Sequence, residues 1–154
     1  MSLTKKFSYQ IIVDKSLIIE SYNGKFTVNE LIEFKKIVGN DIYYNPNFNI
    51  VHDFRGAEFQ FKIEEISKYI KLISENKKYI GNRKSTMLTA TPNQVATSIG
   101  FDMFKKDLKI DVNVCSTFET AFDFVGLHVK DWGQVESQIN KLKTHTVIYD
   151  AFKN

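Results

Sequence analysis

The feature that most constrains the fold is a regular alternation of strand-like and helix-like segments along the chain. Short runs rich in β-branched and aromatic residues recur, and between them lie segments whose apolar residues repeat every three or four positions. Strands that alternate with helices pair through helical crossovers, which gives a largely parallel sheet. The sequence therefore predicts an α/β fold.

The expected strands open with a hairpin, because two strand-like runs flank the short polar turn Asp14-Lys15. An antiparallel hairpin beside parallel strands makes the predicted sheet mixed. Asn23-Gly24, after the second strand, is interpreted as another turn. The predicted strands are 7–13, 16–22, 48–54, 85–90 and 110–115.

Helix starts are marked by capping signals. Thr27 with Glu30, and Ser116 with Glu119, have the spacing of a capping box, and Thr91-Pro92 pairs an N-cap with proline at the first helical position. The predicted helices are one after 27, then 62–79, 91–108, one from 116 through 125, and a short one after 131. The predicted order is ββαβαβαβα plus a C-terminal helix/strand appendage, whose strand spans 144–152.

The composition is that of one ordinary globular domain. The 154 residues are 43% hydrophobic and 25% charged, which excludes a disordered chain. The net charge is only +3 and the basic residues are scattered, whereas proteins that bind nucleic acid gather them to neutralise neighbouring phosphates. We expect no nucleic-acid partner. We place the domain at 1–127 and the appendage at 128–154, packed on the same domain or on a partner in a homodimer.

Several other classes are set aside. Cys115 is the sole cysteine, which excludes an internal disulfide and a thiolate metal site. His52, His128 and His145 lack metal-ligand spacing, and a satisfied core or surface histidine is the simpler interpretation. No apolar run approaches the ~20 residues that span a bilayer, and the first residues lack a signal-peptide core. We expect a cytoplasmic protein with no membrane insertion, no metal and no cofactor.

Four segments resemble the SpoIIAA-like group of the STAS family. Residues 24–31, Gly-Lys-Phe-Thr-Val-Asn-Glu-Leu, are similar to the group's Gly-x-x-Thr-x-x-Glu-Leu helix start, and residues 53–55, Asp-Phe-Arg, are similar to its Asp-aliphatic-Arg strand end. Residues 96–104 and 118–125 are similar to its later helices. The likeness covers residues 7–127 and rests on order and spacing more than on any one motif.

This resemblance implies a STAS (SpoIIAA)-like mixed β-sheet with packed helices. It also implies a role in bacterial-type protein–protein signalling or in small-ligand binding. The best-known switch of the family phosphorylates a serine at the start of the helix after the central strand. Between Asp53 and Ser67 the chain has no Ser or Thr, so that switch is not carried over.

Two polar groups are candidate binding sites, because open α/β sheets bind ligands near the carboxyl ends of their strands. Asp53 and Arg55 would grip a polar ligand or a partner's side chain. The alternative, which we favour, is that Asp53 caps local backbone and the Arg55 stem covers an apolar patch. Thr91 and Asn93 lie at a helix start where an anion would meet free amides, although a plain cap explains Thr91 fully.

Phe59 and Phe61 alternate with polar residues after the central strand. On an exposed segment they would form a lid over an apolar pocket or a docking patch for a partner, and core packing is the simpler alternative.

No nucleophile motif such as Gly-x-Ser-x-Gly is present, and we expect no enzyme. The leading hypothesis is a non-enzymatic STAS-like regulatory or interaction module that contacts an unidentified protein partner. Its surface would be the 62–79 helix, the 53–61 segment or the appendage. The competing hypothesis is a binding protein for a small apolar or amphipathic, lipid-like ligand. That role needs a pocket of roughly 300 Å3 under residues 43–61.

Overall fold

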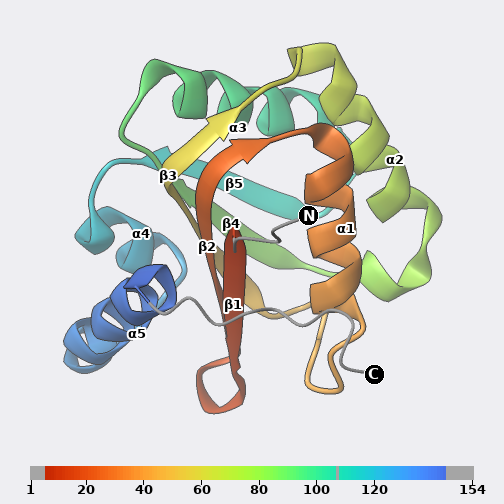
Figure 1. Cartoon of the computed structure of the whole chain (residues 1–154). Coiled ribbons are helices and arrows are strands. Elements are labelled where there is room, and N and C mark those ends of the chain that lie inside the picture. Colours follow the sequence, from red (N-terminus) through yellow and green to blue (C-terminus); the bar gives the residue numbers. More distant parts are fainter. Residues whose placement is uncertain (1–5, 107, 145–154) are drawn as a thin grey trace.

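Five strands form one sheet that carries helices on both faces (Figure 1). The computed structural model describes residues 6–106 and 108–144. The strands are β1 (Phe7–Ile12), β2 (Leu17–Phe26), β3 (Asn49–Phe59), β4 (Arg83–Leu88) and β5 (Ile110–Cys115). The helices are α1 (Val28–Gly39), α2 (Ile66–Glu75), α3 (Pro92–Phe104), α4 (Phe118–Phe124) and α5 (Trp132–Thr144). The predicted α/β class and the order ββαβαβαβα are confirmed.

The sheet is mixed, as expected. Its strand order is β1-β2-β3-β4-β5, with β1 antiparallel to β2 and every other pair parallel. Each crossover moves one strand further in the same direction, and such crossovers are right-handed, so α1, α2 and α3 cover the same face. Figure 1 shows α4 and α5 on the opposite side of the sheet.

Alternating side chains of the strands supply two separate cores, because successive residues of a strand point to opposite faces. The core under α1, α2 and α3 includes Ile18, Phe54 and Met87. The core under α4 and α5 includes Ile19 and Val51. Polar side chains on the first face of the sheet therefore lie beneath three helices. The site described below is a group of such side chains.

Two predicted capping motifs are confirmed at the starts of α1 and α3. The Glu30 amide donates to Thr27 Oγ1 at 3.2 Å and the Thr27 amide donates back to Glu30 Oε1 at 3.1 Å. The predicted Ser116–Glu119 box is wrong. Helix α4 begins at Phe118, so Thr117 is the N-cap and accepts from the Thr120 amide at 3.2 Å.

The predicted end of the central strand at Phe54, and the predicted turn at Asn23-Gly24, are also wrong. Strand β2 continues through Gly24, whose φ of 98° is readily adopted only by glycine. A register shift between Ser21 and Asn23 marks a bulge, after which pairing with β3 resumes and reaches Phe26 opposite Phe59. The bulge therefore precedes Gly24, which is paired with Ala57 in the continued strand, and β2 and β3 remain paired to their ends.

Two helices are shorter than predicted. The expected 62–79 helix is α2 flanked by single 3-10 turns, Ile63–Glu65 and Lys77–Tyr79, because Asn76 leaves helical geometry and caps the second turn. Helix α3 ends at Phe104, just before Lys106 takes a positive φ of 37°.

The expected short helix of the appendage is α5. Its Val135 and Ile139 are fully buried in the second core, so α5 packs on the sheet of its own chain. The predicted strand 144–152 lies outside the described residues, apart from Thr144, which ends α5. No helix in the described part of the chain is long and apolar enough to cross a membrane.

Candidate functional site

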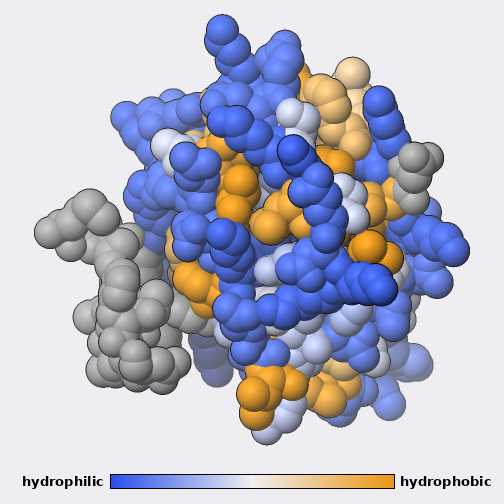
Figure 2. Space-filling view, turned by 90° about the vertical axis from the view of Figure 1, so that its right-hand side faces the viewer, coloured by the Kyte–Doolittle hydropathy of each residue, from blue (hydrophilic) through white to orange (hydrophobic). Residues whose placement is uncertain are grey.

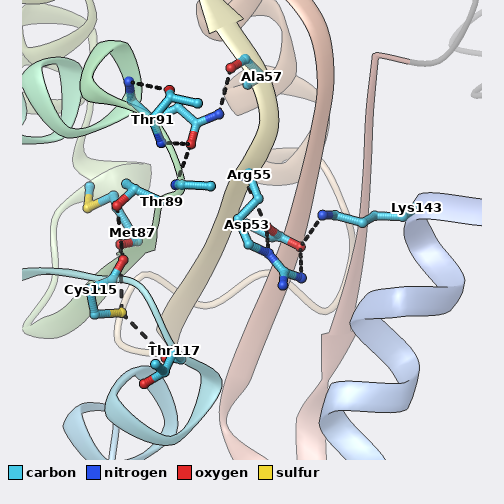
Figure 3. A network of polar contacts seen from close by, with 11 residues as sticks. Asp53, Arg55, Ala57, Met87, Thr89, Thr91, Cys115, Thr117 and Lys143 are labelled. Atoms are coloured by element: carbon cyan, nitrogen blue, oxygen red, sulfur yellow. Dashed lines mark hydrogen bonds and ion pairs between the residues drawn. The ribbon is translucent and has the colours of Figure 1, made fainter.

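The Asp53–Arg55 pair of β3 joins the sheet to α5 (Figure 3). Asp53 is fully buried, and its carboxylate accepts from Arg55 Nε at 2.9 Å and from Arg55 Nη2 at 3.0 Å. Lys143 of α5 adds an ion pair of 3.2 Å, and the Arg55 guanidinium lies 4.6 Å from the centre of the Phe118 ring. Every polar atom of the Asp53 side chain is therefore engaged within the chain.

The other predicted site residues also make internal contacts. Asn93 bonds both backbone groups of Phe59, accepting from its amide at 2.8 Å and donating to its carbonyl at 3.0 Å. Thr91 caps α3 by accepting from the Gln94 amide. Phe59 is buried in the first core, with Phe61 partly buried against it. The structure brings Phe59 and Asn93 together, but it does not join them to the Asp53–Arg55 pair.

A different cluster lies on the face covered by α1, α2 and α3. Glu20 of β2, His52 of β3 and Ser85 of β4 occupy three adjacent strands, and all three are buried. His52 Nδ1 lies 2.8 Å from Glu20 Oε2, and His52 Nε2 lies 2.8 Å from Ser85 Oγ. The three side chains therefore form one hydrogen-bonded relay across the sheet.

The direction of each hydrogen bond in this relay follows from the charge on Glu20. Burial raises the pKa of Glu20, but the charge and hydrogen bond of His52, the charge of Lys35 and the hydrogen bond from Tyr22 outweigh it and lower that pKa. The carboxylate is thus ionised at neutral pH and only accepts. In the neutral form of His52, Nδ1 carries the proton given to Glu20, and Nε2 is then free to accept from the Ser85 hydroxyl.

Two buried cations lie beside the relay. Lys35 of α1 and Arg83 of β4 are each 6% exposed, and both donate to the Tyr44 hydroxyl at 3.3 Å. Arg83 also donates to the Asn45 carbonyl at 2.8 Å, and Lys35 lies 5.2 Å from the centre of the Tyr44 ring. Burial, followed by the charge of Arg83, lowers the pKa of Lys35 from 10.5 to about 7, although Glu20 opposes this.

Neither cation has a carboxylate partner within 4.0 Å in the described part of the chain. The buried Arg83 Nε has no hydrogen-bond acceptor among those residues. Glu20 is the acid of the relay itself, and it is already bonded to Tyr22 and His52. The cluster therefore carries more positive than negative charge when Lys35 is protonated.

His52 and Ser85 of the relay and the two cations line one cavity of about 50 Å3. Most of its other lining residues are apolar or aromatic, among them Phe54, Met87 and Phe101, and Lys105 lines it as well. A water molecule needs at least about 10–15 Å3 of such space, so the cavity has room for a few waters or one small charged group. It is too small for a whole drug-sized ligand, which needs roughly 300 Å3 or more.

A larger groove of about 600 Å3 lies against this cavity at the amino ends of β4 and β5. The cavity and the groove share Ile70, Lys105 and Ile110 as lining residues. Lys105 is held there by the Ile110 carbonyl at 2.7 Å and by Asp102 at 3.3 Å. The apolar side chains of the groove include Tyr79, Ile80, Phe104 and Leu108. A small cavity that holds two buried cations and a larger groove with several apolar side chains thus have a common wall.

The candidate sites predicted from the sequence differ from this cavity and groove, because they were expected at the carboxyl ends of the strands. Glu20 and Ser85 lie inside strand-like runs with no local motif, and His52 was interpreted only as a satisfied core histidine. One signal was visible: Glu20, Lys35 and Arg83 are charged residues within or beside segments that were otherwise expected to be buried. No group of acidic, histidine and cysteine side chains within 6–106 and 108–144 could hold a metal ion.

The chain matches no protein-family model, no curated protein and no solved structure. The likeness to the SpoIIAA-like group of the STAS family therefore stays a prediction from the sequence, and the site is interpreted from its own geometry.

Proposed function

We propose that the protein binds a small amphipathic ligand with a carboxylate head, which enters the cavity beside Lys35 and Arg83 while its apolar part extends into the groove. The observation that carries this proposal is the pair of buried cations without an acidic partner in the described residues. The proposal retains the amphipathic-ligand role predicted from the sequence but changes its place: the cavity beside residues 50–54 has about 50 Å3 instead of the roughly 300 Å3 expected there, so the apolar part is assigned to the neighbouring groove.

The physical reason lies in the free energy of burying charge. An isolated ion inside a protein is costly unless a counter-ion or several hydrogen bonds compensate it. Arg83 remains charged at any physiological pH, and its Nε–H points to no acceptor in the described structure. A carboxylate in the cavity would supply both the missing negative charge and the missing acceptor. Because such hydrogen bonds are charge-assisted, they are stronger than those between neutral groups.

The apolar part of the ligand is assigned from the neighbouring groove. A volume of about 600 Å3 falls within the usual range of ligand pockets. The ligand would cross from cavity to groove at the shared wall, where the flexible Lys105 side chain has to turn aside. Lys105, Lys106 and Lys109 also line the groove, and their positive charge favours the approach of an anion.

Isothermal titration with three probes tests the proposal. Octanoate carries a carboxylate, 1-octanol has the same chain without charge, and octyltrimethylammonium has the opposite charge. We expect octanoate alone to bind, and Lys35→Met or Arg83→Met to weaken it at least tenfold, since one charge-assisted hydrogen bond contributes about 1.5–3 kcal/mol.

The control is Lys36→Met, which removes an exposed charge from the same helix and should leave octanoate affinity unchanged. Equal affinity for octanoate and 1-octanol would contradict the proposed role of the cations. The absence of binding by any probe would contradict the amphipathic site itself.

The protein–protein role and the homodimer remain predictions. Figure 2 shows one side of the molecule as largely hydrophilic, with hydrophobic atoms in separate spots. Of the residues predicted to contact a partner, Phe59 is buried, so its substitution would perturb the core as well as any interface. Arg55→Ala and Phe61→Ala are the better variants for a pull-down. Partner binding that survives both substitutions would contradict the prediction that residues 53–61 form the interaction surface.

A further inference from the structure

The order of atoms in the relay is that of a serine nucleophile, a general base and a carboxylate that orients the base. Ser85 Oγ lies 2.8 Å from His52 Nε2 and Glu20 Oε2 lies 2.8 Å from His52 Nδ1, so a neutral His52 with its proton on Nδ1 accepts from Ser85 and donates to Glu20. In acyl-transfer enzymes this arrangement recurs on unrelated folds and is recognised by geometry, not by sequence position. The distances lie within the range over which a base takes a proton from a hydroxyl.

We propose that Ser85 is an acyl-accepting nucleophile and that the protein hydrolyses esters of the amphipathic carboxylic acids that the cavity binds. The inference rests on the proposed function, because the acid bound beside Lys35 and Arg83 would be the product of the reaction. The ester class follows from the same geometry: an acyl carbonyl in the cavity, with its apolar chain in the groove.

The first step transfers the acyl group to the protein. Ser85 Oγ forms a bond to the ester carbonyl carbon while its proton moves to His52 Nε2. The tetrahedral intermediate then breaks the bond to the alcohol oxygen, which leaves with the proton from His52. The product is an acyl ester on Ser85 and a free alcohol, with no change of oxidation state.

Water completes the cycle by the reverse sequence of proton transfers. It adds to the acyl carbon, gives a proton to His52, and expels Ser85 Oγ, which recovers that proton. The carboxylic acid that is released ionises and is retained by the cations until it dissociates. Glu20 is a positioning residue throughout, because it holds the imidazole in the required tautomer and touches no substrate atom.

The negative charge that develops on the carbonyl oxygen also has donors in the cavity. Arg83 and Ser85 lie two residues apart on β4, so their side chains project from the same face of the sheet. The unpartnered Nε–H of Arg83 and the amine of Lys35 line the same cavity as Ser85. Donors placed before the reaction toward the position of the developing charge are a major source of rate enhancement.

If the relay only satisfied buried polar groups, Ser85 would never become acylated. A covalent adduct on Ser85 therefore distinguishes a catalytic role of the relay from a purely structural one. The probe is p-nitrophenyl octanoate, and the readouts are p-nitrophenolate release and the intact mass of acid-quenched protein, followed by peptide mapping. We expect an octanoyl adduct on the peptide that contains Ser85. Mapping uses the wild-type chain, so it does not depend on any variant folding.

The variants assign the steps. Ser85→Ala should abolish the adduct, and His52→Gln should slow acylation by about a hundred- to ten-thousandfold. The matched control is Ser21→Ala, because Ser21 is a fully buried serine of β2 on the opposite face, with no hydrogen-bond partner in the described residues. It should hydrolyse the probe at the wild-type rate.

Glu20→Gln has its own readout, the effects on kcat and on KM taken separately. We expect kcat to fall while KM stays unchanged, because the amide no longer fixes the imidazole tautomer and Glu20 touches no substrate atom. A raised KM with unchanged kcat would contradict the positioning role.

Octanoate titration in parallel separates the two proposals. Binding of octanoate without an adduct on Ser85, or with an adduct on another residue, would overturn the acyl-transfer inference and leave the binding function standing. Absence of both would overturn both. An adduct on Ser85 without measurable octanoate binding would support the inference and contradict retention of the acid.

Discussion

Replacement of Lys35 by methionine should make the ligand-free protein more stable while it removes ligand binding. Lys35 is buried on α1 without a carboxylate partner in the described residues, so its charge opposes folding. Methionine has a similar length and fills the same space without a charge. Substituting apolar groups for buried ions is often neutral or stabilising. A site kept for function at the expense of stability is expected to behave in this way.

The magnitude follows from the pKa of Lys35, which burial lowers from 10.5 to about 7. Because the unfolded chain binds this proton more tightly, the free energy of unfolding rises with pH between about 7 and 10.5. At about pH 6 the charge costs about 5 kcal/mol, and at about pH 9.5 it costs about 1 kcal/mol. The lost hydrogen bond to Tyr44 offsets about 1 kcal/mol.

We therefore expect Lys35→Met to be more stable than the wild type by about 4 kcal/mol at about pH 6, with a difference near zero at about pH 9.5. Urea denaturation at both pH values, followed by circular dichroism, measures the two differences. Lys36→Met is the control, and its stability should stay within about 0.5 kcal/mol of the wild type at both pH values. A Lys35→Met variant that is less stable than the wild type at both pH values would contradict the cost assigned to the buried charge. It would show that the Lys35 amine has an effective partner.

Three further predictions concern stability and affinity. Octanoate should bind more weakly as pH rises above about 7, because the Lys35 amine loses its charge, and titration calorimetry at several pH values measures this; affinity that rises with pH would contradict it. Asp53→Ala should lower the free energy of unfolding by about 2–3 kcal/mol in urea denaturation, because charge-assisted hydrogen bonds to a fully buried carboxylate are lost; a change below about 0.5 kcal/mol would be inconsistent with them. Gly100→Ala should lower Tm despite better helix propensity, because the new Cβ would lie 2.6 Å from Ile66 Cδ1. Gly133→Ala should raise Tm slightly, because its Cβ would meet no atom within 4 Å. The opposite pair of Tm shifts would contradict this packing argument.

The elements that could be predicted from the sequence are those set by local chemistry. The caps at Thr27 and Thr91 satisfy amides three residues away, so their spacing is visible in the chain. The hairpin and the alternation of strands with helices likewise depend on neighbouring residues. The mixed sheet then follows, because a crossover helix forces parallel pairing.

The candidate site could not be predicted because it depends on register between strands that are distant in the sequence. Glu20 lies directly opposite His52 in the β2–β3 pair, and Ser85 lies opposite Ile50 in the β3–β4 pair. A slip of one residue would move any of these side chains to the other face. The turn predicted at Asn23-Gly24 was wrong for a related reason, since a glycine with positive φ also occurs inside a strand whose pairing with a distant strand continues past it.

The same dependence on tertiary contacts explains the altered interpretation of Asp53 and Arg55. Asp53 was expected to cap local backbone, and its Oδ1 does accept from the Arg55 amide at 3.1 Å. The ion pair with Lys143 joins residues far apart in the chain, and it attaches α5 to the sheet.

The most direct test of the central claim is a crystal structure of the protein soaked with 8-bromooctanoate, with the bromine located by its anomalous signal. We expect the carboxylate in the cavity, within hydrogen-bond distance of Arg83 Nε and the Lys35 amine, and the bromine in the groove beside Ile80 and Phe104. An empty cavity at saturating ligand, or a bromine in the cavity with the carboxylate in solvent, would contradict it.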